Sequence, residues 1–191
     1  MILGESIQDI LIALTKTLKP ESIRSFEGVV GITNGEYVVS DGFALLRYYH
    51  RAIETERDKT IKKNMLESGV KFPNYLGVFP KIDAKKTALD DKQIKVFKSL
   101  LASFKLSKET DKIIMSIDAT GRATLTMDMS VGDCFYIRNL ARYQSAINKK
   151  IYNLLSVEVY NSNCLLLRYG ISDGSKNNTF EYLVCTMRKV E

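Results

Sequence analysis

The order in which helical and strand-like patterns follow one another constrains the fold of this chain more than any single motif. An amphipathic helical pattern is followed by three strand-like runs, and this unit occurs three times. The helical patterns cover residues 6–18, 89–104 and 137–149. The strand patterns cover residues 28–32, 36–40 and 43–50, then 112–119, 123–129 and 133–136, and finally 154–161, 163–171 and 179–189. The repeat predicts an α+β fold in which helices lie on antiparallel strands.

A single unit of this kind leaves the edges of its sheet open, whereas two units can pair their sheets and place both helices on one face. Three units therefore give one complete pair and one unpaired half, whose open edge could serve a further contact. In the first unit, Ser6 is placed to cap the helix, with Asp9 three residues later. The dipeptide Asn34-Gly35 favours a type I′ turn between the first two strands.

Two segments separate the first unit from the second. Residues 54–68 are rich in charge and predict a solvated, basic connector that includes Arg57, Lys59 and Lys63. Residues 71–80 then hold two of the three prolines of the chain together with Phe72, Tyr75 and Phe79. Proline removes a backbone donor and biases the residue before it towards extended backbone, so this stretch is neither a helix nor a central strand. The aromatic residues predict either a loop tied to a core or the lining of a groove.

The composition excludes several classes of protein. Hydrophobic residues make up 45% of the 191 residues, which is enough for a folded core. The sequence has no apolar run of about 18 residues, and its beginning lacks the pattern of a secretory signal, so we expect a cytoplasmic protein without a membrane span. Three cysteines and one histidine, without CxxC spacing, argue against a disulfide framework or a zinc site. We expect Cys134, Cys164 and Cys185 to be buried free thiols.

Three short stretches resemble the bacterial sliding clamp, the β subunit of DNA polymerase III. The linker between the second and third clamp domains reads F-P-D-Y-x-x-V-L-P, and residues 72–80 here read FPNYLGVFP. The clamp motif A-T-D-G-x-R-L resembles VSDGFAL at residues 39–45, and the clamp ending V-V-M-P-M-R-L resembles LVCTMRK at residues 183–189. Each stretch is short, but their order and spacing agree, and the resemblance covers nearly the whole chain.

The resemblance implies a DNA-clamp fold with one complete domain and a half domain. Residues 1–70 would correspond to the first half of the second clamp domain plus the basic connector, and residues 71–191 to a complete third domain. A ring of six domains would then take about four copies of such a chain, so the resemblance also implies a homo-oligomer. The family would make this a DNA processivity factor without cofactors that holds polymerase or repair proteins on duplex DNA by raising their effective concentration.

The resemblance further implies a groove that binds the clamp-binding peptide motifs of such partners. Carried over by position, its residues are Phe26, Ser40, Gly42, Phe43, Leu45, Tyr75, Gly77, Val78, Leu183, Cys185, Thr186 and Met187. Ala44, Gly77 and Thr186 depart from the family pattern, which has a basic residue, an arginine and a proline there. The alternative role for each of these residues is core packing between the sheet and the linker.

The distribution of charge is evidence on DNA binding that does not depend on the motifs. The chain carries a formal charge of +6. The second helical pattern places Lys92, Lys95 and Lys98 away from its apolar stripe, and the third places Arg138, Arg142 and Lys149 opposite Leu140 and Ile147. Basic faces of this kind predict binding to duplex DNA that is independent of sequence and sensitive to salt. The alternative is an ordinary solvated helix face.

Catalysis and metal binding receive no support from the sequence. His50 is expected to be a surface or half-buried strand residue, and Asp41, Asp118, Asp128 and Asp133 are scattered along the chain. Glycine-rich phosphate loops and nucleophile-elbow motifs are absent from the sequence. Two rivals to the processivity factor stay open: a clamp-derived scaffold or decoy that binds peptides without encircling DNA, and a small α+β nucleic-acid-binding or structural domain.

Overall fold

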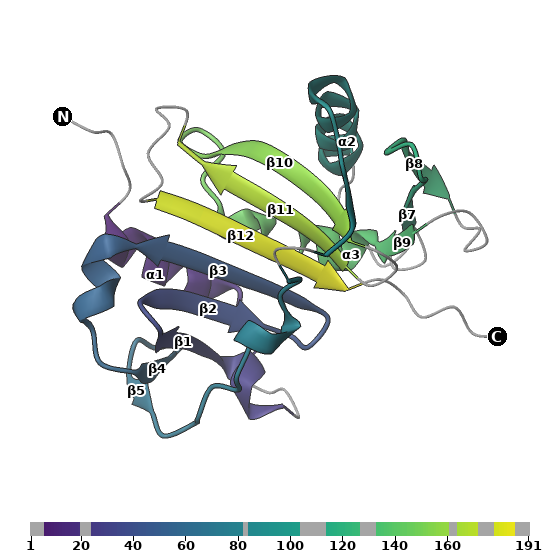
Figure 1. The fold of residues 1–191 in the computed structure, drawn as a ribbon. Coiled ribbons are helices and arrows are strands. Elements are labelled where there is room, and N and C mark those ends of the chain that lie inside the picture. The colour runs from purple at the N-terminus through teal and green to yellow at the C-terminus, as the bar shows by residue number, and fades with distance from the viewer. Residues whose placement is uncertain are drawn as a thin grey trace.

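A computed structural model describes residues 6–19, 24–81, 84–103, 114–126, 133–160, 164–171 and 178–185. It confirms the α+β fold with antiparallel strands. Nine strands form one sheet in the order β5-β4-β1-β2-β3-β12-β11-β10-β6, and three form a second sheet in the order β8-β7-β9 (Figure 1). The first helix and its strands are α1 (Ile7–Lys16), β1 (Val29–Thr33), β2 (Glu36–Ser40) and β3 (Ala44–His50). The last strands are β10 (Asn153–Tyr160), β11 (Cys164–Gly170) and β12 (Asn178–Cys185).

The first unit forms as its sequence predicts. Ser6 Oγ accepts a hydrogen bond from the backbone N–H of Asp9 at 3.1 Å, which confirms the predicted cap of α1. Asn34 and Gly35 both have positive φ, 53° and 73°, and join β1 to β2 in a tight hairpin. Ile10 and Leu14 of α1 are fully buried in the core that covers these strands.

The segment predicted as a solvated connector is instead part of the nine-stranded sheet. It contains a 3-10 turn, Arg51–Thr55, followed by β4 (Lys59–Lys62) and β5 (Glu67–Ser68). β4 pairs with β1, and its central residues Thr60 and Ile61 are buried. The prediction was wrong because two buried residues between two lysines are too short a pattern to indicate a strand.

Three separate units would leave the β3 edge of the first unit open. In the structure this edge is paired with the third unit. β3 pairs with β12 over seven residues, from Asn178 opposite His50 to Val184 opposite Ala44, so the first and third units share one sheet. The second unit supplies β7 (Ile114–Ile117), β8 (Ala123–Thr126) and β9 (Asp133–Tyr136), which form the smaller sheet. The outer strands of the large sheet are β5 and β6 (Lys86–Ala88).

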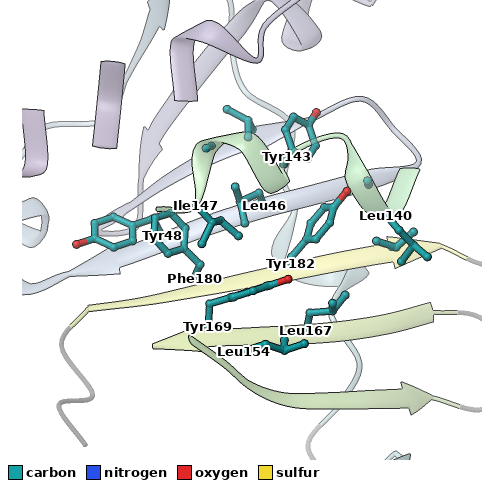
Figure 2. Packing of buried hydrophobic residues seen from close by; sticks show 14 of the residues in the cluster. Leu46, Tyr48, Leu140, Tyr143, Ile147, Leu154, Leu167, Tyr169, Phe180 and Tyr182 are labelled. Carbon is teal, nitrogen blue, oxygen red and sulfur yellow. The ribbon is translucent and has the colours of Figure 1, made fainter. Parts of the chain in front are cut away.

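The helices lie on one face of the large sheet and share a single hydrophobic core. α2 (Asp91–Ser103) packs against β8 and β10, and α3 (Ile137–Ala141) follows β9 directly. Figure 2 shows Leu140, Tyr143 and Ile147, from α3 and the turn after it, packed over β3 and β12. The hydroxyl of Tyr182 on β12 donates a hydrogen bond to the carbonyl oxygen of Asn139 in α3.

The third helix is much shorter than predicted. α3 ends at Ala141, and a turn leads into a 3-10 turn, Gln144–Ala146. Tyr143 packs its ring edge-on against Tyr182 at 5.8 Å and is buried, as is Ile147. These tertiary contacts bend the chain onto the sheet and override the helical periodicity seen in the sequence.

The opposite face of the sheet carries a row of alternating charges across six adjacent strands. In strand order the row is Glu36, Arg47, Glu181, Arg168, Glu158 and Lys86. Arg168 illustrates the pattern: its Nε donates to Glu181 at 2.8 Å and its Nη1 to Glu158 at 2.7 Å. Burial alone would raise the pKa of Glu158, but hydrogen bonds from Lys86, Tyr160 and Arg168 hold it below its ordinary value. The row ties the strands of both units together on the face that receives the linker.

Candidate functional site

The corner between β2 and β3 forms one wall of a groove. Asp41 Oδ1 accepts hydrogen bonds from the backbone N–H groups of Phe43 at 2.9 Å and Ala44 at 2.8 Å, which fixes the turn. Gly42 has a φ of +81°, and a Cβ atom there would lie 1.9 Å from Nη1 of Arg24. The turn therefore needs glycine for its backbone, whereas the flexible Arg24 side chain could move aside for a Cβ atom. It presents Phe43, whose side chain is 55% exposed, at the rim.

The proline-containing linker forms the facing wall, and it crosses the face of the sheet that the helices leave open (Figure 1). Tyr75 is 3% exposed and donates a hydrogen bond from its hydroxyl to Glu36 at 2.8 Å. Its ring lies edge-on to Phe72 and Phe79, at 6.2 and 6.5 Å. Burial raises the pKa of Tyr75 far above its ordinary value; the hydrogen bond from Asn34 offsets part of this rise and the hydrogen bond to Glu36 adds to it, so Tyr75 stays a neutral donor. The aromatic residues fix the linker to the sheet.

The floor of the groove comes from the junction of the two units. Leu45 of β3 and Leu183 of β12 lie opposite each other in the sheet and are buried. The backbone N–H of Cys185 donates to the carbonyl of Phe43 at 2.9 Å and extends this pairing to the corner. The groove encloses about 210 Å³ and is lined by Phe26, Ser40, Gly42, Phe43, Ala44, Leu45, Phe72, Pro73, Asn74, Tyr75, Val78, Leu183 and Cys185.

Most of the residues expected at a groove are thus brought together around one cavity. Gly77 was expected to line the groove but does not. The 3-10 turn Leu76–Val78 directs it outward. Thr186 and Met187 lie outside the described residues. Sequence reasoning did not assign Ala44, Phe72, Pro73 and Asn74 to the lining, although three of them belong to the FPNY stretch that raised the possibility of a groove.

Arg142 was expected on an outward-facing basic stripe, and this prediction was wrong. Its side chain is 16% exposed, and its Nε lies 3.0 Å from Oδ2 of Asp41, whose side chain is 7% exposed. Its guanidinium also lies 5.4 Å from the ring centre of Tyr143. Because Asp41 shapes the β2–β3 corner, this ion pair joins the groove to the segment after α3.

The other five basic residues are exposed. Lys92, Lys95 and Lys98 are exposed on α2, away from the buried Ile94 and Phe97 of the same helix. Arg138 is exposed on α3, with its guanidinium 4.8 Å from the ring centre of Tyr136. Lys149 lies in a turn after the 3-10 turn rather than on a helix. It lines, with Lys98, a hollow of about 360 Å³ between α2 and the strands β10 and β11.

The structure shows the contacts of His50 and the exposure of Cys164 and Cys185. His50 Nδ1 accepts the backbone N–H of Ala52 at 3.0 Å and caps the turn Arg51–Thr55. Cys164 is buried, but Cys185 is exposed, which corrects the expectation of a buried thiol. Among the described residues, no group of three or more His, Cys, Asp or Glu could hold a metal ion. Within those same ranges, no helix is long and apolar enough to cross a membrane.

Comparisons with known proteins identify related folds. No family model matches the sequence, and a search of curated proteins found no match. Solved structures do match. A DNA polymerase sliding clamp from Pseudomonas aeruginosa is 13% identical over 96% of this chain and 66% of that one, with a TM-score of 0.56. DNA polymerase III subunit β from Borrelia burgdorferi, solved with a natural product, is 14% identical over 96% of this chain and 62% of that one, with a TM-score of 0.59.

A third structure, the H. pylori β clamp in complex with diflunisal, is 12% identical over 96% of this chain and 64% of that one, with a TM-score of 0.55. These matches confirm the resemblance to bacterial sliding clamps at the level of the fold. The chain spans about two thirds or less of the length of the clamp chains that it matches.

Proposed function

We propose that this protein is a non-catalytic, clamp-like tether whose groove binds short peptide segments of polymerase or repair proteins. The observation that carries the proposal is the apolar groove at the junction of the β2–β3 corner, the linker and β12. Its volume of about 210 Å³ is below the roughly 300–1,000 Å³ of pockets that enclose small molecules. It suits one or two apolar side chains of a peptide that lies along the surface.

The rim of the groove favours such a ligand. Phe43 and Val78 line the groove, are 55 and 56% exposed, and extend apolar surface beyond the cavity. A few apolar anchors set in a preformed pocket account for most of the affinity in peptide recognition. The walls are held by the Asp41 turn and by the aromatic contacts of Tyr75, so binding does not require them to order first.

A peptide selection tests this proposal. Short peptides are selected from a random phage-displayed library against the protein, and their affinity is measured by fluorescence anisotropy. We expect selected peptides with leucine or phenylalanine anchors to lose about tenfold or more in affinity for Phe43→Asp. Phe43 is exposed, so this variant keeps its fold.

Leu66→Asp is the matched control, because Leu66 is 64% exposed and lies outside the groove. It is expected to bind the selected peptides like the unmodified protein. Equal affinity of Phe43→Asp and Leu66→Asp for every selected peptide contradicts a peptide-binding groove.

We further propose that α2 contacts duplex DNA through Lys92, Lys95 and Lys98. The three side chains are exposed along one side of the helix. Lysine contacts with phosphates bind DNA without reading its sequence, and each contact releases counterions. Lys149 lines a hollow together with Lys98 and extends the basic surface beyond α2, whereas Arg142 is committed to Asp41.

The salt dependence of DNA binding tests this surface. Reversing Lys92, Lys95 and Lys98 to glutamate is expected to lower the magnitude of the slope of log K against log salt by about 2 to 3, because each lost phosphate contact removes roughly 0.9. The control reverses three other exposed lysines, Lys62, Lys63 and Lys71, with the same change in net charge. Identical slopes for the two triple variants would show that binding reflects net charge alone.

The rival function is a scaffold or decoy that binds peptides through the groove without encircling DNA. The groove alone would support this function, because a peptide bound between the β2–β3 corner, the linker and β12 does not need a closed ring. Mass in solution separates the two: a closed ring takes several copies of the chain, whereas a stable monomer at working concentrations favours the scaffold. The cytoplasmic location stays a prediction.

A further inference from the structure

Two thiols face each other across β11 and β12 beside the groove. Cys164 and Cys185 are direct partners in the pairing of these strands. Partners in an antiparallel pair place their side chains on the same face of the sheet. Both thiols are free; Cys164 is buried, whereas Cys185 is exposed and lines the groove.

The backbone places this pair at a site where a disulfide can form. The N–H of Cys185 donates to Phe43 on the β3 side, so the backbone groups of Cys185 point away from β11. Opposite residues at such non-hydrogen-bonded positions have Cα atoms about 4.5 Å apart. Disulfides span Cα separations of roughly 4.4–6.8 Å, so the bond requires no rearrangement of the strands.

We propose that Cys164 and Cys185 form a reversible intramolecular disulfide when the protein meets a small-molecule disulfide such as oxidised glutathione. The thiolate of the exposed Cys185 attacks one sulfur of the oxidant and releases one glutathione thiolate. The thiolate of Cys164 then attacks the Cys185 sulfur and releases the second. Two S–H bonds are replaced by one S–S bond, two electrons pass to the oxidant, and the two protons end on the released thiols.

The surroundings of the thiols set the conditions for this exchange. Burial, with a smaller contribution from the charge of Cys185, raises the pKa of Cys164 to about 11. Burial, followed by the charge of Asp41, also raises the pKa of Cys185. Because the thiolate is the attacking species, the bond is expected to form faster as the pH rises from 7 to 9.

Intact mass and peptide mapping test the proposal on the full chain. After incubation with oxidised glutathione at pH 8.5, we expect a loss of about 2 Da and a proteolytic fragment that joins Cys164 to Cys185. In Cys164→Ser, the resolving thiol is absent, so a glutathione adduct should accumulate on Cys185 instead. Cys134→Ser is the control and should still form the disulfide.

The proposal is overturned if Cys164 stays open to alkylation in the denatured protein after oxidation, or if the only bonds found involve Cys134 or a second chain.

A second readout rests on the proposed function: because Cys185 lines the groove, the oxidised protein is expected to bind a groove-selected peptide at least about threefold more weakly. If the reduced protein binds no peptide, the proposed function fails while the mass result still decides the disulfide. A disulfide with unchanged peptide affinity overturns its link to the groove.

Discussion

Replacement of Arg142 by alanine is expected to lower the free energy of unfolding by about 3–5 kcal/mol, because it removes one partner of a buried ion pair. The side chains of Arg142 and Asp41 are 16 and 7% exposed, and the Asp41 carboxylate would be left in the interior without its cation. Asp41 also accepts the two backbone hydrogen bonds that fix the β2–β3 corner. The loss should therefore loosen the wall that carries Phe43 and weaken peptide binding as well.

Urea denaturation followed by circular dichroism measures this change. Arg138→Ala is the matched control, because Arg138 is exposed on the same segment and its loss should change stability by no more than about 0.5 kcal/mol. Asp41→Asn, made alone and together with Arg142→Ala, completes a double-mutant cycle that should show strong coupling between the two residues. Equal, small effects of Arg142→Ala and Arg138→Ala would show that the ion pair does not hold the corner.

Replacement of Phe180 by alanine is the second change with a large expected effect, a loss of about 3–5 kcal/mol in the free energy of unfolding. Phe180 is fully buried on β12, with its ring 4.5 Å from that of Tyr48 on β3 and 4.8 Å from that of Tyr152. Its removal leaves a cavity where the first and third units meet and ends two aromatic contacts.

The same denaturation measurement applies to Phe180, with Phe43→Ala as the control of equal chemistry at an exposed position. The control is expected to change stability by no more than about 0.5 kcal/mol. Phe180→Leu, expected to cost about 1–2 kcal/mol, keeps the comparison measurable if the alanine variant does not fold. A Phe180→Ala variant as stable as Phe43→Ala would rule out tight packing at the junction.

Local patterns account for the parts of the fold that the sequence predicted well. The capping of α1 by Ser6 and the hairpin at Asn34-Gly35 depend on neighbouring residues, so they can be read directly from the sequence. The pairing of β3 with β12 joins residues about 130 positions apart in the chain, such as Arg47 and Glu181. Hydrophobic alternation predicts strands but does not name their partners, so only the resemblance to clamps, which places both units at one groove, led to this junction.

In the candidate site, too, the residues in local motifs were predicted and those that depend on distant contacts were not. The linker and the β2–β3 corner carry recognisable short motifs, and the structure gathers most of their predicted residues at one groove. Arg142 was misplaced because helical periodicity puts it among solvated basic residues, whereas its partner Asp41 lies about 100 positions earlier in the chain. The end of α3 at Ala141 likewise depends on the contact of Tyr143 with Tyr182, which local propensity does not contain.

The central claim is that the junction of the first and third units forms a groove that binds peptides, and chemical-shift mapping tests it most directly. On addition of a peptide selected against the protein, the NMR signals of Phe43, Leu45, Val78 and Leu183 should shift together and saturate at one affinity. Shifts that cluster on α2 or on the turn between β4 and β5, with these four residues unchanged, would contradict the claim.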